Sequence, residues 1–120
     1  MIDHFNLPVS DLARSRQFYE RILTPLGFPF LMQDGNAVGF GTDTWCFGII
    51  ATPAPFPMLH LAFTASSRDA VDRFFAAATA LGARSNGPPG IRPHYDADYY
   101  AAFVFDPDGH NIEAVCRKKV

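Results

Sequence analysis

Three side chains suited to binding a divalent metal ion stand out in this chain of 120 residues: His4, His60 and Glu113. Two imidazoles and one carboxylate form a donor set that suits Fe(II), Mn(II), Ni(II), Co(II) or Zn(II). Such a set leaves coordination positions open for substrate oxygens or water, where the ion can stabilise negative charge. The residue types therefore predict one divalent metal ion as a cofactor.

An internal repeat gives the two histidines equivalent places in the chain. Ile2–Leu7 aligns with Met58–Phe63, and the histidines are 56 residues apart. Further pairs keep nearly the same spacing: Ser10 with Ser66, Phe18-Tyr19 with Phe74-Phe75, and Leu26-Gly27 with Leu81-Gly82. A repeat of this length indicates two related modules within one domain of residues 1–120. The first module covers about residues 1–52 and the second about 58–117, and the proline-rich segment 52–57 joins them.

Each module is predicted to have the order βαβββ. The first has a helix capped by Ser10 and ended by Gly27, and the second has one capped by Ser66 or Ser67 and ended by Gly82. The later strands are expected at Phe30–Gln33, Ala37–Gly41, Trp45–Ile50, Ala83–Ser85, Ala101–Asp106 and Asn111–Cys116. The turn Asp106-Pro107-Asp108-Gly109 joins the last two strands. The prediction is an α+β fold of two tandem βαβββ modules, whose curved mixed sheet forms a cleft.

Strand alternation predicts which face of the sheet each candidate ligand occupies. Side chains point alternately to the two faces of a strand, so His4, His60 and Glu113 all face away from the helices. A lone histidine on a strand is more often a hydrogen-bonded structural residue, and a glutamate in a final strand can be a solvated edge residue. The repeat favours a shared site, because it places both histidines on the same side.

The segment 86–100 concentrates further polar side chains between the second helix and the last hairpin. His94 is the candidate acid or base, and Arg92 could pair with a substrate carboxylate. Tyr95, Tyr99 or Tyr100 could donate a hydrogen bond to a developing oxyanion. Asn111 shares the face of Glu113 and is a candidate substrate-binding residue. The alternatives are that His94 is exposed without a role, and that Tyr99 and Tyr100 begin a strand and simply pack.

At these residues the sequence resembles the vicinal oxygen chelate superfamily, which includes glyoxalases, bleomycin-resistance proteins and extradiol dioxygenases. The resemblance covers essentially the whole chain, and its most specific part is the run Asp106-Pro107-Asp108-Gly109 followed by Glu113 on the last strand. It implies paired βαβββ modules around one divalent ion, with His4, His60 and Glu113 as the ligands. It also implies a homodimer that completes the cleft.

One departure from that family pattern concerns the number of ligands. Glyoxalase-type relatives carry a fourth protein ligand in the first module, and the matching position here falls near Phe47 or Gly48, neither of which can bind a metal. The expected function is therefore a metal-dependent lyase, isomerase, ring-opening enzyme or dioxygenase acting on a small oxygenated substrate. The alternative is a non-catalytic protein that binds a small molecule or antibiotic, as bleomycin-resistance proteins do.

Composition excludes several other classes of function. A formal net charge of −2 and the lack of a basic aromatic stripe argue against a nucleic-acid partner. No run approaches the roughly 20 apolar residues of a membrane span, and the N-terminus does not resemble a signal peptide. Cys46 and Cys116 are expected to be free thiols, so the sequence predicts a cytoplasmic protein with a small-molecule substrate and no membrane partner.

Overall fold

The computed structural model describes residues 1–120 and contains two α-helices and two four-stranded mixed sheets. The first half of the chain forms β1 (Phe5–Val9), α1 (Leu12–Leu23), the short 3-10 helix η1 (Thr24–Leu26), β2 (Phe30–Asp34), β3 (Ala37–Gly41) and β4 (Trp45–Ala51). The second half forms β5 (His60–Thr64), α2 (Arg68–Ala80), β6 (Ser85–Ile91), β7 (Tyr100–Phe105) and β8 (Asn111–Cys116). The predicted α+β class and the repeated βαβββ order are therefore confirmed.

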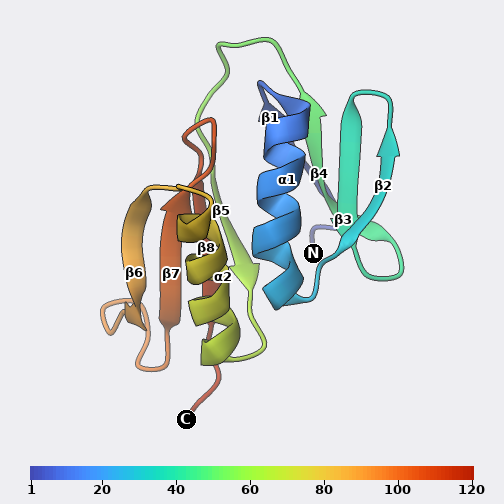
Figure 1. Cartoon of the computed structure of the whole chain (residues 1–120). Helices are drawn as coiled ribbons and strands as arrows, with labels where there is room; N and C mark the ends of the chain where they lie inside the picture. The colour runs from blue at the N-terminus through green and yellow to red at the C-terminus, as the bar shows by residue number, and fades with distance from the viewer.

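The two halves have the same sheet topology. The strand order is β1-β4-β3-β2 in the first sheet and β5-β8-β7-β6 in the second, with the first and last strands of each half running parallel (Figure 1). The register also repeats, since Asn6 lies opposite Gly48 in the first sheet and Ala62 lies opposite Glu113 in the second. This shared register lets equivalent positions of the two halves be compared directly.

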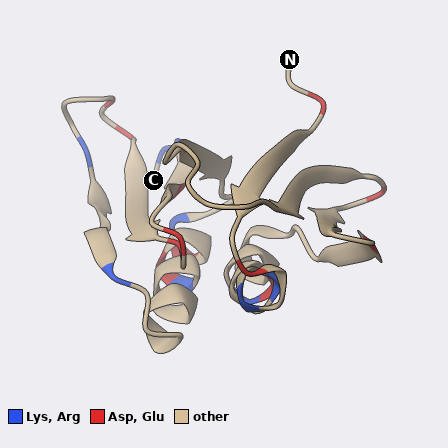
Figure 2. Ribbon diagram, turned by 90° about the horizontal axis from the view of Figure 1, so that it is seen from above, with Lys and Arg blue, Asp and Glu red and all other residues tan.

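Both helices lie on the same side of the sheets and pack against each other (Figure 2). A single core cluster of 21 buried residues draws on both halves, so the two modules share one hydrophobic interior. Phe47 of β4 and Phe63 of β5 meet edge to face in it, with ring centroids 5.0 Å apart. The opposite faces of the two sheets carry no helix. Neither helix has the length and apolar character needed to cross a membrane.

The cap of α1 differs by one residue from the prediction. Asp11, rather than Ser10, accepts a hydrogen bond from the backbone N–H of Arg14, at 3.0 Å. Ser10 does not cap the helix because its backbone N–H and its hydroxyl both donate to the carboxylate of Asp108. In α2 the cap is Ser67, one of the two predicted serines. A tertiary contact thus displaced the expected local one.

The expected strand at Ala83–Ser85 was placed too early, because β6 extends over Ser85–Ile91. Its run Asn86-Gly87-Pro88-Pro89-Gly90 was predicted to be a loop, since Gly and Pro usually mark turns. β6 is the outer strand of its sheet, where a proline without an N–H removes no essential ladder bond. Its pairing with β7 is correspondingly irregular, with two register shifts. The connecting loop therefore shortens to residues 92–99.

The turn between β7 and β8 fastens the second half of the chain to the first. Asp106 is buried, and its Oδ2 accepts a hydrogen bond from the hydroxyl of Tyr19 in α1, at 2.6 Å. Its Oδ1 accepts the backbone N–H groups of Asp108 and His110, both at 2.9 Å, which holds the turn in shape. One carboxylate therefore orders its own turn and binds the opposite module.

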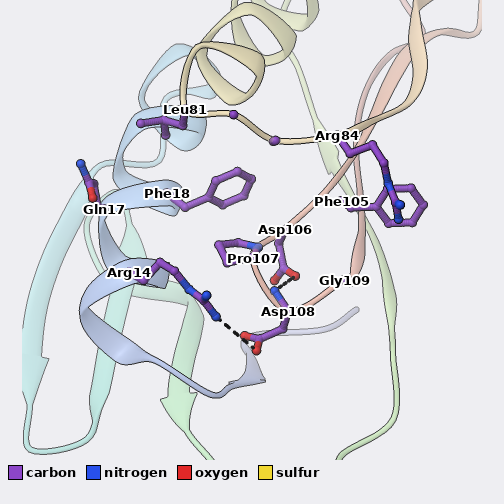
Figure 3. A pocket seen from close by; sticks show the side chains of 12 residues that line it. Arg14, Gln17, Phe18, Leu81, Arg84, Phe105, Asp106, Pro107, Asp108 and Gly109 are labelled. Carbon is purple, nitrogen blue, oxygen red and sulfur yellow. Dashed lines mark hydrogen bonds and ion pairs between the residues drawn. The ribbon is translucent and has the colours of Figure 1, made fainter.

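Two neighbours of Asp106 extend this attachment. Asp108 accepts the two hydrogen bonds from Ser10, and the guanidinium of Arg14 lies 3.8 Å from it (Figure 3). The fully buried His110 accepts the N–H of Leu59 at Nδ1, so its Nε2 carries the proton and donates to the carbonyl of Pro8, at 2.8 Å. We call Asp106, Asp108 and His110 together the module clamp.

Tyr19→Phe tests the module clamp by leaving Oδ2 of Asp106 buried without its phenolic partner. We expect the free energy of unfolding to fall by about 1–3 kcal/mol, because an unsatisfied buried acceptor keeps its desolvation penalty. Urea denaturation at neutral pH measures this change. The control is Tyr95→Phe, whose exposed ring makes no side-chain hydrogen bond and should lower stability by much less. Equal stabilities for the two variants would contradict the clamp.

The same tyrosine predicts how stability depends on alkaline pH. Burial, reinforced by the negative charge of Asp106, raises the pKa of Tyr19 well above its usual value. Above about pH 10 the unfolded chain releases this phenolic proton while the folded chain retains it, so a rise in pH favours unfolding. Urea denaturation at increasing pH should therefore show stability falling above pH 10, with a shallower fall in Tyr19→Phe. A parallel fall in both proteins would refute this assignment.

Candidate functional site

His60 and Glu113 form the closest pairing of candidate ligand atoms in the structure. They lie on the helix-free face of the second sheet, and Nε2 of His60 is 3.1 Å from Oε1 of Glu113. Adjacent strands β5 and β8 bring them together, because the register places His60 beside Asn111 and Ala62 beside Glu113. The Glu113 side chain is only 3% exposed, whereas the His60 side chain is 50% exposed. The pair thus presents a buried anion beneath an accessible imidazole.

The hydrogen bonds around His60 determine what can lie between the two side chains. Nδ1 of His60 is 3.0 Å from the backbone carbonyl of Asn111, an acceptor, so Nδ1 carries a proton. If the ring is neutral, Nε2 then presents a lone pair toward a carboxylate oxygen, and two acceptors repel each other. A cation shared by Nε2 and Oε1 would remove this repulsion.

The separation of the two atoms fits a shared metal ion. A metal binds imidazole nitrogen and carboxylate oxygen at about 2.1 Å, so two such ligands at right angles stand about 3.0 Å apart. A histidine that ligates a metal also commonly donates its other ring N–H to a carbonyl or carboxylate, as His60 does. The donor pair His60 and Glu113 therefore fits a divalent cation both in chemistry and in spacing.

Tyr99 fixes the other oxygen of Glu113. Its hydroxyl donates a hydrogen bond to Oε2, and its ring is buried. Burial, with this hydrogen bond and the charge of Glu113, raises the pKa of Tyr99 to about 12. The phenol therefore stays protonated at neutral pH and serves as a constant donor, which leaves Oε1 directed toward His60.

His4 lies on the other module, apart from this pair. It precedes β1, its side chain is half exposed, and its Nδ1 is 2.8 Å from Asp3. Its ring packs on Trp45 of β4, with centroids 4.6 Å apart. No group of three or more His, Cys, Asp or Glu side chains comes close enough in one chain to hold a metal ion. One chain therefore brings together two of the three predicted ligands.

The place of a fourth ligand in the first module is occupied by a glycine. Because Asn6 and Ala62 hold the same register, the counterpart of Glu113 is Gly48, one of the two positions expected from the repeat. A Cβ atom on Gly48 would lie 2.3 Å from Oδ1 of Asn6 and 3.2 Å from the Trp45 ring. The helix-free face of the first sheet thus offers an indole and a bare backbone where the second offers a carboxylate.

Phe103 and Asn111 lie beside the His60–Glu113 pair on the second helix-free face. Phe103 lies opposite Glu113 in the register and stacks on His60, with centroids 6.2 Å apart and planes inclined by 24°. Asn111, predicted to bind substrate, is half-buried on this face and accepts a hydrogen bond from Asn86 at 3.2 Å. This face combines one buried negative charge with a flat aromatic border.

The loop of residues 92–99 places the two predicted catalytic residues next to this face. His94 and Tyr95 are exposed, with ring centroids 4.2 Å apart, and Tyr95 lies 5.0 Å from Tyr99. A chain of rings therefore leads from His94 to the phenol that contacts Glu113. His94 itself makes no hydrogen bond to the His60–Glu113 pair, so its part in catalysis stays a prediction.

Two residues predicted to bind substrate have other partners in the structure. Arg92 donates from its two terminal nitrogens to the carbonyls of Gly90 and Pro88, at 2.8 and 2.7 Å, and lies over the Phe103 ring. Tyr100 begins β7 and points to the helix-covered face, where its hydroxyl donates to Asp72 at 2.6 Å. Tyr100 is therefore separated from Glu113 by the sheet, as the packing alternative anticipated.

Sequence reasoning overlooked Phe103 and Arg117. Strand alternation and the pairing of β7 with β8 would have located Phe103 opposite Glu113. Arg117 lies just beyond the predicted strand Asn111–Cys116, and its guanidinium is 4.7 Å from the centre of the Tyr99 ring. Its position four residues after Glu113, an even spacing that continues the alternation of β8 one residue past its end, was the available signal.

A cavity of about 570 Å³ lies elsewhere, between α1, the end of α2 and the turn of the module clamp (Figure 3). None of the predicted site residues lines it. Its carboxylates, Asp106 and Asp108, are already satisfied by Tyr19, Ser10 and backbone N–H groups. The chemistry of the chain is therefore concentrated on the helix-free face.

Comparison with known proteins agrees with this architecture. The chain resembles the uncharacterised protein YqjT of Bacillus subtilis, with 31% identity over 93% of this chain and 95% of that protein. Among solved structures, a glyoxalase/bleomycin resistance protein from Albidiferax ferrireducens has a TM-score of 0.83 and 30% identity, covering 94% of this chain and 96% of its own.

More distant similarity reaches a protein with a named activity. The lactoylglutathione lyase of Agrobacterium tumefaciens has a TM-score of 0.72 at 18% identity, over 97% of this chain and 92% of its own. That likeness concerns the fold alone. The model of the Glyoxalase/Bleomycin resistance protein/Dioxygenase superfamily matches residues 1–114, nearly the whole chain. This protein therefore belongs to the Glyoxalase/Bleomycin resistance protein/Dioxygenase superfamily.

Proposed function

We propose that this protein is a divalent-metal-dependent enzyme that acts on a small substrate whose oxygens chelate the metal. The observation that carries the proposal is the approach of Nε2 of His60 to Oε1 of Glu113 at 3.1 Å, with Nδ1 of His60 committed to a backbone carbonyl. This arrangement suits a cation bound between the two side chains. The ion would be Fe, Mn, Ni, Co or Zn, each of which accepts nitrogen and oxygen ligands.

The third ligand would come from a second copy of the chain. His4 lies on the helix-free side of the first module, apart from His60 and Glu113. A homodimer that sets the first module of one subunit against the second module of the other would add His4 of the partner subunit to the pair. Dimerisation therefore belongs to the proposal, because one chain supplies only part of the donor set.

The metal would supply electrostatic stabilisation of negative charge developing on a substrate oxygen. The protein's own residues would supply the rest. Tyr99 holds Glu113 in one orientation, and Phe103 packs along His60. His94, exposed on the adjoining loop, would accept or donate a proton at the substrate. These roles suit lyase, isomerase, ring-opening or dioxygenase chemistry.

A non-catalytic binding protein is the second candidate function. The observation that favours it is the aromatic character of this face, where Phe103 stacks on His60 and the exposed Tyr95 ring lies 5.0 Å from Tyr99. Such a protein would use the same face to hold a small molecule by stacking. Metal content separates the two candidates, because only the enzyme requires the ion.

Metal analysis tests the proposed enzyme directly. Protein dialysed after exposure to Zn(II) should retain a stoichiometric ion at neutral pH, and His60→Ala and Glu113→Ala should lose it, because each removes one donor of the pair. His4→Ala should also lose it if the partner supplies that ligand, and light scattering on the wild type should then show a dimer. The control is His94→Ala, which should keep the metal. A wild-type protein without stoichiometric metal would remove the basis of the enzyme proposal.

His94→Ala tests proton transfer separately from metal binding. The variant should retain the metal and lose about 10²–10⁴-fold in turnover, the usual contribution of a positioned acid or base. Turnover is measured as lactoylglutathione lyase activity on protein loaded with Zn(II) or Ni(II), and as catechol-dependent oxygen uptake on protein loaded with Fe(II). Unchanged turnover would leave His94 without a catalytic role.

A further inference from the structure

Arg117 follows the last strand on the same side of the sheet as Glu113. Its guanidinium lies 4.7 Å from the centre of the Tyr99 ring, and the hydroxyl of that ring donates to Glu113. The ring therefore spans the space between the basic group and the His60–Glu113 pair. A ligand on this face of the sheet would reach the guanidinium with one end and the candidate metal position with the other.

The hydrogen-bond donors of Arg117 are uncommitted. It makes no hydrogen bond within the chain, and its side chain is 64% exposed. Oδ2 of Asp96 lies 3.9 Å from Nη1 of Arg117, which is longer than a hydrogen bond and typical of a loose surface ion pair. Stacking on Tyr99 holds the guanidinium in place while leaving its N–H groups available.

Arg92, the arginine predicted for a substrate carboxylate, is in the opposite situation. Both of its terminal nitrogens donate to backbone carbonyls of β6. Its planar fork, which would bind a carboxylate through two parallel hydrogen bonds, is therefore already engaged. Of the two guanidiniums over the aromatic rings of this face, only that of Arg117 is free to bind an anion in this way.

We infer that Arg117, stacked on Tyr99, anchors the carboxylate group of the ligand, so that this protein takes carboxylate-bearing small molecules. This inference deepens the proposed function by naming a ligand class, and rests on it only for the position of the site. It requires no metal, so it can be tested on the metal-free protein. The loose pair with Asp96 makes that residue an internal competitor for the guanidinium.

The experiment compares a charged ligand with its neutral analogue. Benzoate and benzamide have nearly the same shape, and each is titrated into the metal-free protein while NMR follows the signals of Tyr99 and Arg117. Wild type should bind benzoate more tightly than benzamide. Arg117→Gln should weaken benzoate binding about tenfold, as expected for the loss of a charge-assisted hydrogen bond, and leave benzamide unchanged. Arg117→Lys should recover part of the loss, because it restores the charge without the fork.

Two further variants distinguish carboxylate binding by Arg117 from a nonspecific effect of positive charge and from a purely structural role of Arg117. Lys118→Gln removes the next positive charge along the chain and should change benzoate binding much less than Arg117→Gln. Asp96→Asn removes the competing carboxylate and should tighten benzoate binding about two- to threefold. A structural role for Arg117 would not produce this opposite effect.

Two results would overturn the inference. One is equal affinity of the wild type for benzoate and benzamide, and the other is equal benzoate affinity in wild type and Arg117→Gln. Because the titration contains no metal, either result leaves the metal analysis of His60 and Glu113 unaffected. Absence of bound metal would likewise leave the benzoate comparison intact, so the two proposals fail independently.

Discussion

The hydrogen bond between Tyr19 and Asp106 is the contact on which the arrangement of the two halves depends. Each half can bury only part of its apolar surface by itself, and the shared core forms only when both helices lie on the same side. The module clamp fixes that relation with polar groups from the turn before β8. The same turn leads directly into β8, the strand that carries Glu113, so the module clamp also positions that strand.

The candidate site illustrates how a buried charge is kept in a small protein. Glu113 is nearly inaccessible to water, and a carboxylate in that position is costly unless it is paired and hydrogen-bonded. Tyr99 donates a hydrogen bond to one oxygen, and Nε2 of His60 lies 3.1 Å from the other. The burial that makes the group expensive also makes its interaction with a cation strong, so the site is suited to hold positive charge.

The two modules share topology and register but differ on their open faces. Where the second carries Glu113, the first carries Gly48 beneath Trp45. The first sheet therefore presents an indole and His4, and the second presents the acidic pair with an aromatic border. The open face of the first module is therefore a packing surface, and that of the second module is charged. For this reason neither module by itself contains the whole donor set.

Much of this protein follows from its sequence alone. The 56-residue repeat and the alternation of apolar residues predict the βαβββ order, the faces of His60 and Glu113 and the final hairpin, since these depend on local periodicity. Only the tertiary structure decided the features that depend on distant partners. Ser10 bonds to Asp108 instead of capping α1, and pairing with β7 holds the proline-containing β6 as an edge strand. Tyr100 points toward α2, whereas Tyr99 points toward Glu113. The separation of His4 from His60 and Glu113 was also decided by the tertiary structure, because the spacing of residues in the sequence does not predict how one module packs on the other.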